Sequence, residues 1–298
     1  MNLDGARVLL TGATGGLGQA IARALSARGA ALVLTGRRAE VLEPLAAEIG
    51  GRAVASDLAD PAAVDALLAE AGEVDVLVAN AGLPGSGGLH SFTVEEIDRA
   101  LTVNLRAPML LAQALSPLMV ERGRGHLLFM SSLAGKAGAP GSSVYAATKF
   151  GLRGFGLALR EDLASKNVGV SVVLPGFIRE AGMFAESGAK LPPFVGTKRP
   201  DDVARAVVKA IEQNRAEIDV APVALRAGTL LASLAPGPVG SVQRKLGAVK
   251  TSEAIGRGQT EKRCRAERSP CGSRSAEELW PRGPELPRAA CGCITRRR

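Results

Sequence analysis

Tyr145 and Lys149 are the residues whose types and spacing suggest chemistry most directly. Tyr145 is the only tyrosine among 298 residues, and Lys149 follows four positions later, so in a helix both side chains would leave the same face. A free phenol has a pKa of about 10 and is a weak acid and base at neutral pH. A neighbouring ammonium lowers that pKa usefully only where most water is excluded. The spacing therefore suggests a reactive tyrosine in a nearly dry site, and the alternative is a pair of surface residues.

A glycine-rich turn near the N-terminus suggests a phosphate site. The apolar run 6–10 leads into TGATGGLG at 11–18, and apolar residues at helical spacing come next. This order of strand, turn and helix presents backbone N–H groups and a positive helix end to a pyrophosphate. Gly12 would allow the tight turn, Gly16 the approach of the phosphates, and Gly18 the packing of helix on strand. No Lys-Ser or Lys-Thr pair follows the glycines, which argues against a nucleoside triphosphatase.

Two arginines follow the second apolar run, where a strand would reach the ribose of a bound dinucleotide. An acidic residue at this point would hold the 2′-hydroxyl of NAD, whereas an arginine would accept the 2′-phosphate of NADP. The sequence has Arg37 and Arg38 there and no carboxylate. NADP(H) is therefore favoured over NAD(H), and the alternative is that both arginines merely begin a solvated helix.

Small and polar residues follow the third and fourth apolar runs. Asp57 would accept a hydrogen bond from an adenine amine, or it would cap the turn before the next helix. Asn80-Ala81-Gly82 follows the fourth run, and small residues there let a flat cofactor lie against the backbone. Both positions are candidate cofactor contacts.

A helical asparagine and two serines complete the candidate polar residues. Asn104 lies in residues 93–121, which have helical spacing interrupted at Pro108, and Ser131 and Ser132 follow the fifth apolar run. An asparagine in a helix is most often structural. Either serine could simply cap the end of a strand, and this alternative is stronger for Ser131.

The order of apolar runs predicts the fold. Short strand-like runs alternate with helical segments, which is typical of an α/β protein with a Rossmann-type doubly wound parallel sheet of about seven strands and helices on both faces, in a single domain. Ligands of such sheets bind beyond the carboxyl ends of the strands, where the candidate residues lie. The expected strands are residues 6–10, 31–34, 52–55, 74–79, 127–130, 168–174 and 217–220.

Taken together, these features resemble the short-chain dehydrogenase/reductase family over about residues 5–220. Each motif is loose alone, but all of them in this order are specific. The resemblance rests on the glycine turn TGxxxGxG, Asn80-Ala81-Gly82, Asn104, Ser132 thirteen residues before Tyr145, YxxxK at 145–149, and Pro175-Gly176.

The resemblance implies reversible hydride transfer between NADP(H) and a carbonyl or secondary alcohol, in a homodimer or homotetramer. It implies that Tyr145 exchanges the proton, Lys149 lowers the tyrosine pKa and binds the nicotinamide ribose, Ser132 holds the substrate oxygen, and Asn104 supports a water path to Lys149. The alternative function is a non-enzymatic dinucleotide-binding redox sensor, which would have no chemical need for Tyr145. The implied cofactor contacts are Gly12, Thr14, Gly16, Leu17, Gly18, Arg37, Asp57, Leu58, Asn80, Ala81, Gly82, Tyr145, Lys149, Pro175, Gly176 and Ile178.

The loop after Pro175-Gly176 departs from the family pattern. Relatives often have a threonine four residues beyond this glycine, near the nicotinamide amide, and this sequence has Glu180. We expect either a hydrogen bond from the amide to Glu180, or an outward Glu180 with Met183 and Phe184 folded over the site. Apolar residues through 177–200 suggest a substrate loop and an apolar substrate, although any packed loop contains such residues.

The C-terminal part divides into two segments. Residues 223–250 form an apolar, basic-edged helical extension, for which subunit or lid packing ranks above contact with a membrane surface. Residues 251–298 lack periodicity and are expected to be disordered. The abrupt change past residue 263 resembles out-of-frame translation. This tail carries +5 (11 basic minus 6 acidic residues) of the net charge of +8, with all four cysteines.

Composition limits the remaining functions. Because no cysteine precedes residue 264 and neither a signal peptide nor a long apolar run is recognisable, we expect a cytoplasmic protein without disulfides. His90 and His126 are the only histidines and belong to no cluster with metal-ligand spacing, so no metal is predicted. Most of the basic charge lies in the tail, and nucleic acid is not an expected partner.

Overall fold

The computed structural model describes residues 1–189, 191, 195–245, 254–256 and 258, with only the backbone described for 242–245. The chain divides into two units, Met1–Lys262 and Arg263–Arg298. The second unit, for which disorder is predicted, lies outside the described residues.

The described residues form a seven-stranded parallel sheet in the order β3-β2-β1-β4-β5-β6-β7. The order reverses between β1 and β4, which is where ligands of doubly wound sheets bind. The predicted α/β fold is thus confirmed, with strand ends within two residues of those expected. The strands are β1 (Arg7–Thr11), β2 (Ala31–Gly36), β3 (Arg52–Ala55), β4 (Val76–Ala79), β5 (Gly125–Met130), β6 (Val168–Pro175) and β7 (Glu217–Val220).

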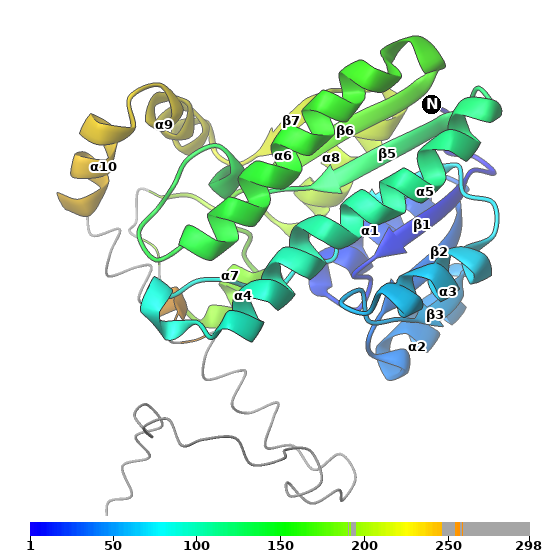
Figure 1. Ribbon diagram of the computed structural model, residues 1–298, viewed down its shortest axis with the longest axis horizontal. Coiled ribbons are helices and arrows are strands. Elements are labelled where there is room, and N and C mark those ends of the chain that lie inside the picture. Colours follow the sequence, from blue (N-terminus) through cyan, green and yellow to red (C-terminus); the bar gives the residue numbers. More distant parts are fainter. Residues whose placement is uncertain (190, 192–194, 246–253, 257, 259–298) are drawn as a thin grey trace, which may run out of the picture. The chain divides into compact units, whose positions relative to one another are not determined.

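Helices cover both faces of the sheet because successive strand residues point to opposite sides. On β1, Val8 and Leu10 pack with α1, α2 and α8, whereas Leu9 packs with α3, α5 and α6. Figure 1 shows α5 and α6 on one face and α1 and α8 on the other. The helices are α1 (Gly16–Ser26), α2 (Ala39–Ile49), α3 (Pro61–Ala71), α4 (Val94–Leu101), α5 (Ala107–Glu121), α6 (Ser143–Leu163), α7 (Gly182–Ser187), α8 (Pro200–Glu212), α9 (Val223–Leu234) and α10 (Pro236–Lys245).

The long helical segment predicted over residues 93–121 is interrupted earlier than expected. A π-helical turn at Thr102–Arg106 separates α4 from α5, and Pro108 lies in the first turn of α5, where it breaks no helix. Such π turns recur at functional sites because they re-aim a side chain. Here the turn carries Asn104 and aims it into the protein.

The helices α9 and α10 follow β7 in the described part of the chain. α9 and α10 lie at the edge of the molecule beyond the carboxyl ends of β6 and β7 (Figure 1), so the extension expected over 223–250 is helical up to Lys245. Within the described part of the chain, none of the helices combines the length and apolar character needed to cross a bilayer.

Candidate active site

Tyr145 and Lys149 lie on the N-terminal half of α6, beside the end of β5. The buried face of this helix includes Val144, Thr148 and Leu152, so the four-residue spacing turns both side chains toward the sheet. Lys149 Nζ lies 5.6 Å from the centre of the Tyr145 ring and donates a 2.8 Å hydrogen bond to the Met130 carbonyl. Lys149 is 3% exposed, and Tyr145 is partly buried. The ammonium is therefore withdrawn from water, and the phenol beside it is partly so.

The two serines at the end of β5 have different partners. Ser132 shares a hydrogen bond with the Tyr145 phenol, and its hydroxyl lies 3.3 Å from the Pro175 carbonyl. Ser131 instead donates to the backbone carbonyl of Lys149 at 2.9 Å. Ser132 can thus contact a reacting oxygen held against the phenol, while Ser131 fastens α6 to the sheet.

Asn104 connects the loop after β4 to α6. Its Oδ1 accepts the Leu83 N–H at 2.6 Å, and its Nδ2 donates to the Leu83 carbonyl at 3.0 Å and to the Thr148 hydroxyl at 3.3 Å. The side chain is fully buried, so losing it would leave the Leu83 groups without these partners. These contacts make Asn104 at least a structural bridge beside Lys149, and the implied water path stays a prediction.

The protonation of the pair differs from the sequence-based expectation. Burial raises the pKa of Tyr145 to about 12, with the hydrogen bond to Ser132 acting in the opposite direction. Burial also lowers the pKa of Lys149 to about 8. The expected lowering of the tyrosine pKa is therefore not found, because burial penalises the charged forms of both groups and the ammonium is turned to the Met130 carbonyl. Tyr145 is a neutral phenol able to donate a proton.

The glycine turn and the end of β4 are locked together. Gly12 has a φ of +68°, and a Cβ there would lie 2.7 Å from the Ala81 Cα. The Thr11 hydroxyl accepts the backbone N–H groups of Asn80 and Ala81, each at 3.0 Å. Asn80 Nδ2 donates to the carbonyls of Thr11 and Gly12 at 3.0 and 3.2 Å. Asn80 thus builds the turn, and Thr11, which the sequence reasoning missed, supports it from the end of β1.

The start of α1 fits an anionic group. No side chain caps this helix end, and its first turn holds no acidic residue, so its backbone N–H groups and positive end suit a pyrophosphate. A Cβ on Gly18 would lie 2.2 Å from the Gly12 carbonyl oxygen, so only glycine allows this close packing. A Cβ on Gly16 would lie 2.5 Å from the Ala181 Cβ, so the loop before α7 rests on the turn. The residues present fit a dinucleotide.

The arginines after β2 differ in their contacts. Arg38 donates to the Thr14 carbonyl of the glycine turn at 2.8 Å, while Arg37 acts on Asp57 through its charge. Asp57 accepts hydrogen bonds from Arg99 of α4 at 2.7 Å and from the Ala59 N–H at 3.1 Å. Burial opposes ionisation of Asp57, but these hydrogen bonds outweigh it and hold the pKa below its usual value.

Asp57 has the second of the two roles expected for it. Its carboxylate accepts the Ala59 N–H and so caps the turn before α3, whereas Asp60 caps the helix itself by accepting the Ala62 N–H. The hydrogen bond to an adenine amine stays a prediction. Arg99 is a second residue that sequence reasoning missed, since no spacing along the chain links α4 to the loop after β3.

The remaining expected cofactor contacts border the same edge of the sheet. Leu58 and Ile178 are buried in the core, and Ile178 forms an isolated parallel bridge with Lys198. Pro175 ends β6, and the Gly176 N–H donates to the Val220 carbonyl. Leu17, in the first turn of α1, lies beside Gly182, where a Cβ would be 3.6 Å from it.

The loop after β6 brings one apolar side chain, that of Met183, beside the site and turns Glu180 outward. Glu180 has a left-handed φ of +74°, is half exposed, and pairs with Arg179 at 3.3 Å and Arg199 at 3.5 Å. The Met183 methyl lies 3.6 Å from the position of a Cβ on Gly82, as do Lys149 Nζ and Asn104 Oδ1. The structure thus has the outward arrangement of Glu180, with Met183 as an apolar neighbour of the amine.

Two aromatic rings support this loop. Phe177 and Phe184 pack edge to face with ring centres 5.1 Å apart, a favourable geometry for aromatic pairs. Residues 190 and 192–194 of the expected substrate loop, including Phe194, lie outside the described residues.

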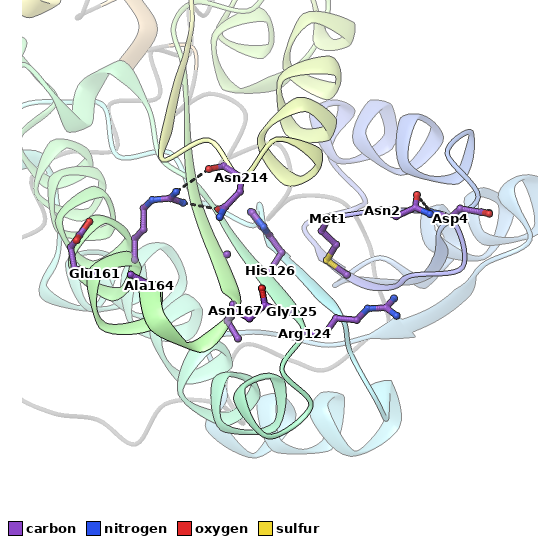
Figure 2. Close-up of a pocket in the computed structure, with 13 residues that line it drawn as sticks. Met1, Asn2, Asp4, Arg124, Gly125, His126, Glu161, Ala164, Asn167 and Asn214 are labelled. Atoms are coloured by element: carbon purple, nitrogen blue, oxygen red, sulfur yellow. Dashed lines mark hydrogen bonds between the residues drawn. The ribbon is translucent and has the colours of Figure 1, made fainter.

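A separate cavity of about 560 Å³ lies at the amino ends of β5 and β6, whereas the candidate site lies at their carboxyl ends. Figure 2 shows the residues that line this cavity. His126 borders it but is itself buried, and burial lowers its pKa to about 3. Its Nε2 lies 2.9 Å from the Ser171 hydroxyl. His126 is a neutral core residue, and the described residues hold no group of His, Cys, Asp or Glu arranged for a metal ion.

Comparison with known proteins agrees with this geometry. The family model described as short chain dehydrogenase matches residues 6–192. The ketoacyl reductase HetN of Nostoc sp. strain PCC 7120 is 37% identical over 227 residues, which cover 73% of this chain and 79% of the relative.

Two solved structures share the fold. A short-chain dehydrogenase from Sphingobium yanoikuyae in complex with NADPH is 30% identical, with a TM-score of 0.68 over 77% of this chain and 93% of its own. A 3-ketoacyl-(acyl-carrier-protein) reductase from Brucella melitensis complexed with NADH is 28% identical, with a TM-score of 0.66 over 73% and 97%. The family match over more than half of the sequence, together with these relatives, identifies the chain as a member of the short-chain dehydrogenase/reductase family.

Proposed function

We propose that this family member is an NADPH-dependent reductase that transfers hydride reversibly between NADP(H) and an apolar carbonyl compound or secondary alcohol. The supporting observation is the convergence of Tyr145, Lys149, Ser132 and Asn104 beyond the carboxyl ends of β4 and β5. Membership of the family supplies the coarser statement, an NAD(P)-dependent oxidoreductase acting on CH–OH or C=O groups.

Each side chain has a role that its contacts support. The reduced nicotinamide supplies the hydride when bound. Tyr145 donates its proton to the carbonyl oxygen, and Ser132 holds that oxygen by a second hydrogen bond. Lys149, held at the Met130 carbonyl, stabilises the phenolate that proton donation leaves. Asn104 holds Thr148 and the loop at Leu83 in place around Lys149.

The substrate we propose is an acyl carbonyl compound, such as a 3-oxoacyl thioester. Met183 is an apolar side chain beside Gly82, the same loop holds the packed rings of Phe177 and Phe184, and two similar proteins are named ketoacyl reductases. The test is a panel of 3-oxoacyl thioesters of increasing chain length, followed by the loss of NADPH absorbance. Turnover should improve with chain length; turnover confined to short polar ketones would contradict the apolar assignment.

NADP preference is tested by replacing Arg37 with alanine. Asp57 is already held by Arg99, which leaves the charge of Arg37 for a 2′-phosphate, and charge-assisted hydrogen bonds of this kind are worth about 1.5–3 kcal/mol, or roughly tenfold or more in affinity. Arg37→Ala should therefore raise the dissociation constant of NADPH at least about tenfold and barely change that of NADH. Arg38→Ala is the matched control, because it removes the neighbouring arginine, which bonds the Thr14 carbonyl. Equal losses for both dinucleotides in Arg37→Ala would reject the assignment.

Arg99→Met should also weaken NADPH binding, but less. Without Arg99, the Asp57 carboxylate would attract Arg37 and offset its charge, a surface effect of about 1 kcal/mol, or roughly fivefold. NADH, which lacks the 2′-phosphate, should be affected less. Isothermal titration calorimetry measures the ratio of the dissociation constants of NADPH and NADH. The control is Arg205→Met on α8, which removes another exposed arginine in an ion pair. An unchanged ratio in Arg99→Met would contradict this role.

We further infer that residues 1–222 form the catalytic domain, that 223–250 extend it, and that the chain assembles as a homodimer or homotetramer through the outer face of α6. The exposed Phe150 on that helix supports such a contact. Light scattering after size exclusion tests the assembly, and a monomer at working concentrations would contradict it.

A further inference from the structure

α9 is apolar on two opposite sides. Its inner side packs Leu225 against Leu133, Val172 and Leu174, and buries Ala232. Its outer side carries four large aliphatic residues that are 58–78% exposed. Three of them, Val223, Leu230 and Leu234, recur at helical spacing on one face, with the fourth, Leu231, beside them. These four residues are called the α9 stripe.

The α9 stripe is the largest gathering of exposed aliphatic side chains on one helix in the described part of the chain. A single exposed leucine is ordinary on a protein surface, but several in one row mark an interaction surface. A helix with apolar residues on both sides is typical of one that is covered on both sides. Within the described part of the chain, core residues pack on the inner side and the outer side stays exposed.

The helix also borders the proposed reaction site. A Cβ on Gly176, the residue after β6, would lie 3.1–3.2 Å from Ala221, Leu133 and Leu225. Leu133 directly follows Ser132, which shares the hydrogen bond with the phenol. The outer surface covered by the α9 stripe is therefore one helix away from the residues around the reacting oxygen.

The charges around the helix favour an anionic surface over a second copy of the chain. Residues 221–245 contain Arg226, Arg244 and Lys245 and no aspartate or glutamate. A two-fold contact would place these like charges opposite one another. Arg226 forms a long ion pair of 3.9 Å with Asp219 of β7 and stays half exposed. Asp219 is bound more closely by Lys136, at 2.7 Å, and the other acid of β7, Glu217, pairs with Lys136 and Arg153.

We propose that the α9 stripe docks this protein on the surface of a bilayer that contains anionic phospholipid. The aliphatic side chains enter the boundary between headgroups and acyl chains, and the basic residues approach the phosphates. The stripe would attach the protein to the bilayer surface and would not cross the bilayer. The docking itself does not depend on the reaction, but its consequence rests on the proposed function: an apolar carbonyl substrate reaches the site from the lipid side.

The test is sedimentation of the full-length protein with vesicles, without dinucleotide or substrate. The parent should bind phosphatidylcholine–phosphatidylglycerol vesicles, and binding should weaken with salt and with removal of phosphatidylglycerol. Leu230→Ser/Leu234→Ser should lower the partition coefficient at least about tenfold, since two buried aliphatic side chains are lost. The matched control is Leu89→Ser/Leu118→Ser, which removes two exposed leucines elsewhere and should bind like the parent.

Three results would overturn the proposal. The parent protein does not bind the vesicles, both double variants bind them equally, or Leu230→Ser/Leu234→Ser dissociates an oligomer that the parent forms, which would assign the stripe to a second copy. Every variant keeps the basic tail. If the tail alone bound the vesicles, the parent and both double variants would therefore bind them equally. Reduction of a water-soluble ketone, measured in parallel, should be unchanged in Leu230→Ser/Leu234→Ser. If the parent does not reduce the ketone, the result counts against the proposed function and not against membrane docking.

Discussion

Replacing Tyr145 by phenylalanine should lower kcat for carbonyl reduction by about 10²–10⁴-fold, the usual contribution of a positioned general acid. The phenol is the proton donor in the proposed reaction, and the ring can stay in place because phenylalanine keeps its shape. Burial raises the tyrosine pKa to about 12, so the residue holds its proton throughout the neutral range. Stopped-flow or steady-state loss of NADPH with a 3-oxoacyl substrate measures the change.

NADPH binding to Tyr145→Phe is the control for this result. Affinity should stay within about threefold of the parent, or below 1 kcal/mol, because the glycine turn, Arg37 and Lys149 are untouched. Unchanged turnover would contradict the role of Tyr145. Retained binding with no tyrosine-dependent turnover on any substrate would favour the redox sensor.

Replacing Lys149 by methionine should abolish most activity and yet stabilise the protein at neutral pH. The methionine keeps the volume of the side chain but cannot stabilise a phenolate, so kcat should fall by about 10²-fold or more. The buried ammonium is also costly to the fold. Its pKa of about 8 against 10.5 for a free lysine corresponds to about 3 kcal/mol below pH 8. Loss of the hydrogen bond to the Met130 carbonyl costs about 1 kcal/mol. The free energy of unfolding of Lys149→Met should therefore exceed that of the parent by about 2 kcal/mol.

The stabilisation should depend on pH in one direction. Between pH 8 and about 10 the unfolded lysine keeps its proton while the folded one loses it, so the parent's free energy of unfolding rises there relative to that of Lys149→Met. The raised pKa of Tyr145 acts only above pH 10. Chemical denaturation of both proteins at pH 7 and pH 9.5 measures the difference. A destabilised variant whose deficit is the same at both pH values would contradict the buried-ammonium interpretation.

The sequence predicts the fold well because the relevant signals are local. Runs such as 52–55 and 217–220 are bounded by turn residues and become β3 and β7 with those limits. The sheet order then follows from the parallel crossovers and the glycine turn. The same local logic places Tyr145 and Lys149 on one face of α6, as the structure does.

Two contacts that the sequence could not predict join segments far apart in the chain. Arg99 reaches Asp57 across 42 positions, and Thr11 supports Asn80 across 69, and no periodicity encodes such pairs.

The sequence predicts the dry surroundings of the phenol and the nearby charge, but it does not show that the ammonium bonds the Met130 carbonyl or that burial dominates the pKa of Tyr145. The sequence leaves two arrangements open for Glu180. Its left-handed backbone and its ion pairs with Arg179 and Arg199 fix the outward one.

The most direct test of the proposed reaction follows the hydride itself. NADPH carrying deuterium at the transferred C4 position is incubated with a 3-oxoacyl thioester and either the parent or Tyr145→Phe, and the product is analysed by mass spectrometry. The expected result is a hydroxyacyl product with one deuterium on the carbinol carbon, formed by the parent and nearly absent with Tyr145→Phe. A product without deuterium, or equal labelled product from both proteins, would contradict hydride transfer at the Tyr145 site.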